Sequence, residues 1–208
     1  MMLFPELKSW IEALPKPSLE EPVHQRAIER LAAWIETARR EGPIRPLVFV
    51  CTHNSRRSIL SEMSWNALAA YNGLSDAVPA FSAGSEAARV SPNTIEALQG
   101  RGFQIIAKKD HWRGRWSEKQ PEHALFSKKL GATELPASGF AAVMVCAEAD
   151  AACPFVPGAH QRISMPLEDP KRFDHQDDAV AHYAATLDHI AALLSMSFER
   201  ALKAAKPL

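Results

Sequence analysis

The sequence lacks an excess of charge of either sign, because 24 Lys and Arg residues are balanced by 24 Asp and Glu residues. This balance argues against a nucleic acid or an anionic membrane surface as the main partner. No apolar run approaches the ~20 residues that a membrane-spanning helix needs. The first ten residues lack a basic stretch followed by a long apolar core, so no secretory signal is expected. Internal repeats and low-complexity segments are also absent.

Cysteine is scarce as well, with Cys51, Cys146 and Cys153 as its three occurrences in 208 residues. An odd number of widely spaced cysteines does not suit a structural disulfide framework. Together with the missing signal, it predicts reactive thiols and a cytoplasmic location. The length suits one domain that can bury a good core.

Short apolar stretches alternate with amphipathic helical patterns along the chain. The patterns predict strands at 47–50, 78–82, 103–107 and 140–145, and helices at 20–42, 58–71, 92–99 and 180–198. The first helix is expected to begin at Glu20-Glu21-Pro22 and to end at Gly42-Pro43, and Ser91 is expected to cap the third. This alternation predicts an α/β fold with a central four-stranded parallel sheet flanked by helices on both faces. Residues 1–45 are predicted to form an N-terminal helical extension packed on a domain of residues 46–208, within a single domain overall.

The most informative stretch joins the first predicted strand to the helix after it. It reads Cys51-Thr52-His53-Asn54-Ser55-Arg56-Arg57-Ser58. Backbone N–H groups from Thr52 to Arg57 and the positive end of the helix predict a loop that binds a tetrahedral oxyanion. Arg57 would clamp two oxygens of that anion in a fork. The same field favours the thiolate of Cys51, the nucleophilic form, to which Ser58 could donate a hydrogen bond.

A second cysteine pair, Cys146 and Cys153, follows the last predicted strand. Two small buried apolar residues are the simpler interpretation of this pair. If the segment between them is helical, seven steps separate their Cα atoms by roughly 10 Å. A disulfide needs a Cα separation within about 7 Å, so the two could bond only if the helix unwound.

Four segments together resemble the low-molecular-weight tyrosine phosphatase superfamily and, within it, the thioredoxin-coupled arsenate reductases. They are Cys51 to Ser58, Phe81 to Gly84 with Ser91 to Asn93, Cys146 to Cys153, and Asp169-Pro170. The resemblance implies the phosphatase fold, a flavodoxin-like three-layer arrangement, over roughly residues 47–174. It does not cover the first 45 residues or the segment from Asp110 to Ser138, which we call the insertion.

The resemblance implies a thiol relay that reduces arsenate to arsenite. Cys51 would be the nucleophile and Cys146 and Cys153 the resolving cysteines, with thioredoxin as the reductant and without a metal or organic cofactor. Asp169 matches the family's general acid, which would protonate a departing oxygen. An ordinary Asp-Pro turn is the simpler alternative for Asp169.

Further residues carry weaker predictions. Asn54, which would also brace the loop, Glu62 and Ser82 match positions that bind potassium in some arsenate reductases, although Glu62 could instead be a solvated first-turn residue. Arg56 stands where the family usually has a second loop cysteine, and it would add charge near the anion if it pointed inward. Trp112 and Trp116, in the insertion, are most simply packing residues, with an anion or partner surface, or a lid, as the alternative.

Two other functions remain open beside the reductase. One is a phosphatase that hydrolyses phosphomonoesters through a phosphocysteine, using Cys51, Arg57 and Asp169. Phosphotyrosine proteins are doubtful substrates, because Lys171-Arg172-Phe173 replaces the paired tyrosines of the phosphotyrosine-specific branch. The other is a non-enzymatic oxyanion or redox sensor. A phosphatase needs neither Cys146 nor Cys153, so their necessity separates it from the reductase.

Overall fold

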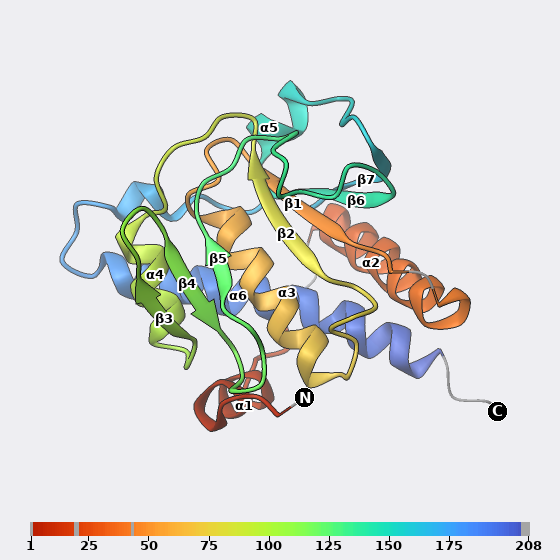
Figure 1. Ribbon diagram of the computed structural model, residues 1–208, viewed down its shortest axis with the longest axis horizontal. Helices are drawn as coiled ribbons and strands as arrows, with labels where there is room; N and C mark the ends of the chain where they lie inside the picture. Colours follow the sequence, from red (N-terminus) through yellow and green to blue (C-terminus); the bar gives the residue numbers. More distant parts are fainter. Residues whose placement is uncertain (1, 19–20, 43, 205–208) are drawn as a thin grey trace.

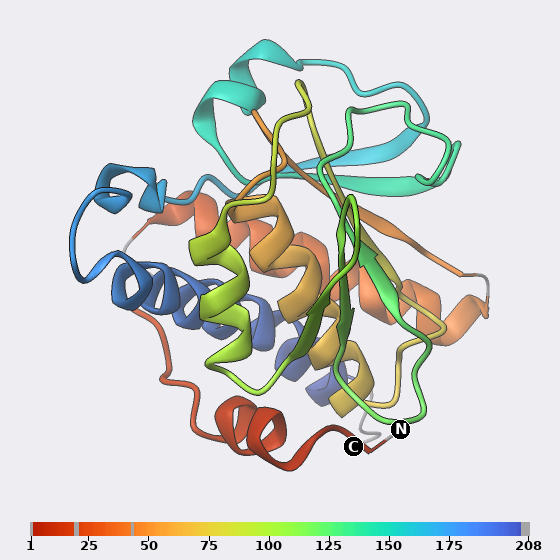
Figure 2. The same ribbon diagram turned by 60° about the vertical axis from the view of Figure 1, so that its left-hand side comes forward.

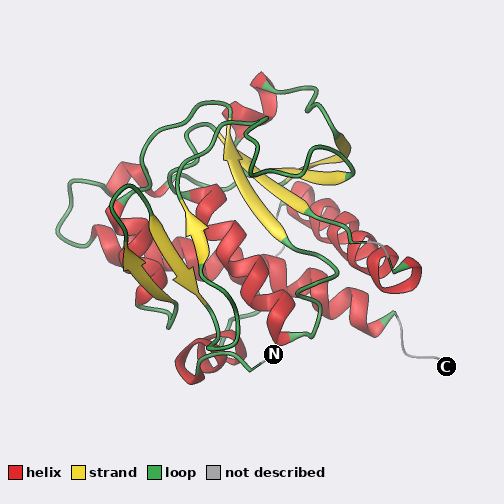
Figure 3. Cartoon of the chain, viewed as in Figure 1, coloured by secondary structure: helices red, strands yellow, loops and turns green. Residues whose placement is uncertain are grey.

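The central sheet has four parallel strands in the order β2-β1-β6-β7 (Figures 1 and 3). The computed structural model describes residues 2–18, 21–42 and 44–204. The strands are β1 (Leu47–Cys51), β2 (Ala80–Gly84), β6 (Phe140–Met144) and β7 (Ala159–Ser164). Every residue of β1 and β6 is buried, which explains why these two strands read as uniformly apolar runs.

Helices flank this sheet, as the sequence predicts. The predicted helices are present as α2 (Pro22–Glu41), α3 (Arg57–Tyr71), α4 (Pro92–Gln99) and α6 (Ala179–Lys203). Helix α3 packs on β1 and β2, α2 packs on β7, and α6 packs against α2, α3 and α4. The expected N-terminal helix is present as α2, and a short helix α1 (Pro5–Glu12) precedes it (Figure 2).

The predicted membership of the sheet is partly wrong. The stretch 103–107 does form a strand, β3 (Gln104–Ala107), but it pairs antiparallel with β4 (Trp112–Arg115), which pairs antiparallel with β5 (His123–Leu125). The fourth parallel strand is β7, whose sequence AHQRIS is too polar to be recognised from an apolar run. The insertion therefore builds most of a second sheet.

Several local predictions need correction. Ser91 does occupy the N-cap position of α4, but its hydroxyl caps no backbone group and lies 3.4 Å from the Tyr183 hydroxyl. Trp116 is buried, with 6% of its surface exposed, so it is core and not a lid.

Gly42 ends α2 with φ of 78°, as expected of a helix-terminating glycine. The predicted boundary residues Glu20 and Pro43 lie outside the described residues.

The carboxyl ends of the parallel strands meet at one edge of the sheet. Cys51 ends β1, Gly84 ends β2, and Cys146 lies two residues after β6. The short helix α5 (Ala147–Ala152) and the turn η1 (Pro170–Phe173) belong to the segments at this edge, whereas α1 lies at the far end of the molecule (Figures 1 and 2). Within the described residues, no helix is long and apolar enough to cross a membrane.

Candidate active site

Cys51 lies at the start of the loop that joins β1 to α3. Its side chain is buried, and its sulfur lies 3.0 Å from the Ser58 hydroxyl, in the first turn of α3. Within the part of the chain that the structure describes, no backbone N–H from Thr52 to Arg56 donates to a protein acceptor. A set of unused N–H groups ahead of a helix N-terminus is the arrangement that binds oxyanions. The oxyanion loop stays a prediction, which these N–H groups without protein acceptors support.

Asn54 braces this loop from within. Its backbone is left-handed, with φ of 46°, a conformation that asparagine tolerates better than most residues. Its side-chain N–H groups donate to the hydroxyls of Ser58 (2.9 Å) and Ser82 (2.8 Å), and its carbonyl accepts from the backbone of Lys128 (2.7 Å). The bracing expected of Asn54 thus runs mainly through hydroxyls, and it ties the loop to β2 and to the insertion.

Glu62 lies beneath the loop and is fully buried, so its interpretation as a solvated residue is wrong. One carboxylate oxygen accepts from the Ser82 hydroxyl at 2.5 Å, and the other lies 2.8 Å from the ring Nε2 of His123. Burial pushes the pKa of Glu62 upward, but the charge of Lys128 and the contact with His123 outweigh it and hold the pKa below its usual value. Two residues of the insertion therefore keep this carboxylate charged.

The potassium prediction for Asn54, Glu62 and Ser82 stays a prediction. Their side-chain polar atoms already have protein hydrogen-bond partners. Among the residues described, no group of three or more His, Cys, Asp or Glu side chains is arranged to hold a metal ion.

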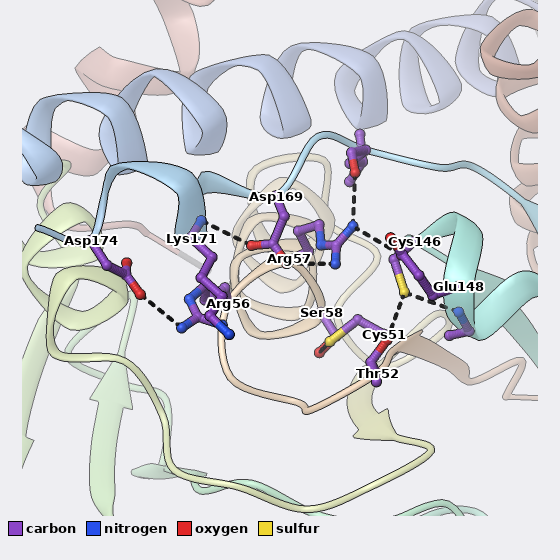
Figure 4. A network of polar contacts seen from close by, with 12 residues as sticks. Cys51, Thr52, Arg56, Arg57, Ser58, Cys146, Glu148, Asp169, Lys171 and Asp174 are labelled. Atoms are coloured by element: carbon purple, nitrogen blue, oxygen red, sulfur yellow. Dashed lines mark hydrogen bonds and ion pairs between the residues drawn. The ribbon is translucent and has the colours of Figure 1, made fainter.

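Arg57 links the loop to the segment that carries Asp169 (Figure 4). Its guanidinium donates to the Leu167 carbonyl at 3.0 Å and to the Asp169 carboxylate at 2.7 Å, and it lies 3.9 Å from Glu148. Arg57 is thus in direct contact with the predicted acid. Asp169 is also the N-cap of η1, where its other oxygen accepts from the Lys171 backbone at 3.0 Å.

Cys146 is fully buried at the N-cap of α5. Its sulfur accepts from the Ala149 backbone at 3.3 Å and lies 3.4 Å from the hydroxyl of Thr52, the residue after Cys51. Burial raises the pKa of Cys146, and the hydrogen bonds from Thr52 and Ala149 and the charge of Arg57 offset this only in part. The thiol form of Cys146 is therefore favoured.

Cys153 is partly exposed at the C-cap of α5, and all three cysteines are free thiols. The segment between Cys146 and Cys153 is helical, as the argument about their spacing assumed. Arg162 of β7 fastens the end of this helix. It donates to the Cys153 carbonyl at 3.0 Å and to the Asp150 carbonyl, and it pairs with the Asp150 carboxylate at 2.5 Å.

Two other loop side chains, those of Arg56 and His53, contact residues outside the loop. Arg56 donates to the Tyr183 hydroxyl at 2.7 Å and to Asp174 at 3.0 Å, so it does not point inward. His53 is exposed and lies 3.6 Å from Glu86.

A groove of 740 Å³ adjoins the Arg57–Asp169 pair. Its walls come from the start of α2, from α5, from the segment around η1 and from α6. One wall carries the stacked rings of Phe173 and His182, whose centroids are 3.5 Å apart. The groove is large enough for an organic group and far exceeds the needs of a small oxyanion.

Similarity to known proteins agrees with this geometry. Residues 46–116, which include the loop and α3, match the family model described as low molecular weight phosphotyrosine protein phosphatase. A protein named arsenate reductase from Brevibacillus brevis is 30% identical over 124 residues, which cover 60% of this chain and 75% of that protein. The chain belongs to the low molecular weight phosphotyrosine protein phosphatase family. Members of this family are enzymes, phosphatases or arsenate reductases.

Solved structures share the fold of this phosphatase-family member. A low molecular weight protein tyrosine phosphatase from Bacillus subtilis superposes with a TM-score of 0.51 at 18% identity, covering 77% of this chain and 99% of that one. A low molecular weight phosphotyrosine phosphatase from Vibrio cholerae O395 gives a TM-score of 0.52 at 12% identity, covering 78% and 99%. Because both identities are low, these likenesses speak for the fold alone.

Sequence reasoning missed several residues that support the loop or the neighbouring segments α5 and η1. They are His123, Lys128, Arg162, Asp174 and Tyr183. None stands near the loop in the sequence, and no local pattern marks them. Tyr183 lies within the helix predicted at 180–198, and its hydroxyl contacts Arg56 and Asp174.

Proposed function

We propose that the chain is an arsenate reductase that passes a disulfide along Cys51, Cys146 and Cys153. The observation that carries this proposal is the position of Cys146 against the loop. Its sulfur lies 3.4 Å from the hydroxyl of the residue that follows Cys51. The similarity to a protein named arsenate reductase supports the same reaction.

The first step is attack of the Cys51 thiolate on arsenic(V). The N–H groups of the loop would hold the anion, and Arg57 would turn from Asp169 toward its oxygens. Asp169 would supply a proton so that one oxygen leaves as water, which gives a Cys51–arsenic adduct. The Ser58 hydroxyl, 3.0 Å from the sulfur, would stabilise the thiolate before the attack.

Reduction of arsenic takes place in the second step. The Cys146 thiolate attacks the Cys51 sulfur and forms the Cys51–Cys146 disulfide. The electron pair of the sulfur–arsenic bond stays on arsenic, which departs as arsenite. Two thiols have then supplied the two electrons that convert arsenic(V) to arsenic(III).

The third step moves the disulfide outward. Cys153 attacks Cys146 and releases Cys51, which requires α5 to unwind, because its helical length keeps the two cysteines apart. Cys153 is the more exposed of the pair, so a dithiol reductant can reach the new disulfide. We propose thioredoxin for this role and the cytoplasm as the compartment, since the relay depends on a reducing environment. No step needs a metal or organic cofactor.

A second candidate function is hydrolysis of phosphomonoesters through a phosphocysteine. The groove of 740 Å³ favours it, because Arg57 and Asp169 line a space next to the loop that has room for the organic part of an ester. Phosphate and arsenate are alike in shape and charge, so one loop can serve both reactions.

The deciding experiment measures thioredoxin oxidation that depends on arsenate, alongside hydrolysis of p-nitrophenyl phosphate. Wild type is compared with Cys51→Ser, Cys146→Ser and Cys153→Ser. The relay predicts that all three substitutions abolish arsenate reduction, while only Cys51→Ser abolishes ester hydrolysis. Ester hydrolysis without any arsenate reduction would reject the reductase and leave the phosphatase.

A further inference from the structure

Two consecutive arginines, Arg56 and Arg57, hold the two ends of one segment (Figure 4). The segment is residues 167–174, which we call the acid loop. Arg57 binds its beginning, through the Leu167 carbonyl and the Asp169 carboxylate. Arg56 binds its end, through the Asp174 carboxylate at 3.0 Å.

Arg57 cannot serve the acid loop and a bound anion equally. Its guanidinium is the clamp that the anion needs, yet it contacts Asp169 at 2.7 Å in the structure. When an anion draws this guanidinium away, Asp169 loses its strongest contact with the loop around Cys51. A second connection is then required if the acid is to remain near the leaving oxygen.

Arg56 provides a connection that is independent of the anion. Its side chain points to Asp174 and Tyr183, away from the unused N–H groups of the oxyanion loop. We propose that Arg56 is a positioning residue, which keeps the acid loop and Asp169 over the anion while Arg57 turns to the substrate. This inference rests on the proposed role of Asp169 as the acid.

The surroundings of Arg56 suit a lasting contact. The side chains of Arg56 and Asp174 are 15% and 21% exposed, and Tyr183 is fully buried. Burial alone would lower the pKa of Arg56, but Tyr183 and Asp174 raise it, so the guanidinium stays charged. Burial and the hydrogen bond to Asp174 raise the pKa of Tyr183, so its hydroxyl remains a donor. These three groups join the oxyanion loop, the end of the acid loop and α6 in one network.

Leaving groups of different basicity test the inference. An acid matters for phenyl phosphate, whose leaving oxygen needs a proton, and little for 2,4-dinitrophenyl phosphate. We expect Arg56→Gln and Asp174→Asn to lower kcat/KM for phenyl phosphate at least about tenfold more than for the dinitrophenyl ester. Asp169→Asn should show the same pattern more strongly, and Arg56→Lys should restore part of the loss. An equal loss on both esters would overturn the inference.

Arg101→Gln is the matched control. Arg101 forms an Arg–Asp bridge to Asp188 of α6 at 2.7 Å, remote from the acid loop, with both side chains 30% exposed. Its loss should lower stability without changing the ratio of the two ester rates. A change of that ratio in this variant would mean that any loosening of α6 has the same effect, which would also overturn the inference.

Hydrogen exchange with inorganic phosphate gives a readout that does not depend on turnover. In wild type, the amides of residues 171–174 should stay protected when phosphate is bound. In Arg56→Gln they should lose protection only when phosphate is present, since Arg57 still holds the loop without it. Equal exchange in the two proteins with phosphate bound would reject the role of Arg56. Failure of wild type to bind phosphate, measured by calorimetry, would instead reject the proposed oxyanion site, and the inference with it.

Discussion

Substitution of Arg162 by glutamine should loosen α5 without disturbing the rest of the fold. A six-residue helix is too short to be stable by itself, so its closed form depends on its contacts. Arg162 supplies charge-assisted hydrogen bonds to the carbonyls of Cys153 and Asp150 and an ion pair with the Asp150 carboxylate. Hydrogen bonds to a charged group contribute about 1.5–3 kcal/mol, and part of the lost contact would be replaced by water. A net loss of about 2 kcal/mol raises the open population of α5 roughly thirtyfold.

Amide exchange of the segment 149–153 measures this opening directly. We expect exchange there to accelerate by roughly the same factor in Arg162→Gln, while amides of β1 and β6 keep their protection. Formation of the Cys146–Cys153 disulfide by an added oxidant should accelerate in parallel, since opening must precede bonding. Ser164→Ala is the matched control, because it removes only the 2.6 Å bond to the Asp150 side chain. Exchange that is unchanged in Arg162→Gln, or equally faster in Ser164→Ala, would refute the reasoning.

Three further predictions concern the loop and its supports. Glu62→Gln should destabilise the fold by about 1–3 kcal/mol at pH 7, because Ser82 and His123 lose the charged carboxylate that they contact. The pKa of Glu62 is lowered in the folded state. Its contribution to stability is therefore present at pH values above the ordinary pKa of a glutamate and is lost as the pH falls through the lowered pKa. Denaturation measured as a function of pH should show this loss in wild type but not in Glu62→Gln. Gly84→Ala should abolish Cys51-dependent activity, since a Cβ at this position would lie 2.1 Å from the Glu86 carbonyl oxygen and 2.7 Å from the Thr52 carbonyl oxygen. Gly131→Ala is the control: a Cβ there meets open space, so the substitution should cost only backbone strain and leave activity intact. Because burial raises the pKa of Cys146, arsenite release in a single turnover should accelerate between about pH 7 and pH 9, and a flat profile would contradict attack by that thiolate.

The sequence predicted the parts of this fold that depend on local pattern. Strands β1 and β6 were predictable because both of their faces are buried, and α4 because proline and glycine mark its ends. Strand β7 was not predictable, because it has no apolar run. It forms a strand through its pairing with β6 and its packing against α2. Likewise, the sheet to which β3 belongs is decided by its partner β4, and the periodicity of β3 carries no information about that choice.

The candidate site divides in the same way. The loop from Cys51 to Ser58 was recognisable because all its parts are consecutive in the chain. The direction of Arg56 was not, because Asp174 and Tyr183, which attract it, lie 118 and 127 residues further along. The burial of Glu62 was also unpredictable, since a charged residue becomes acceptable in the interior only when distant residues such as His123 supply its partners.

The insertion, residues 110–138, is therefore a structural support of the site, and its deletion should not yield a smaller active enzyme. His123 completes the hydrogen bonds of Glu62, the Lys128 backbone holds Asn54, and the same segment bonds with both backbone groups of Gly84. A shortened chain would keep every residue that reacts and lose the partners that shape the pocket. In mutational surveys, positions at which substitution impairs activity should consequently appear in two clusters, one around Cys51 and one some seventy residues downstream. The second cluster lies in the insertion, where comparison with a relative that lacks this segment would suggest that substitutions are tolerated.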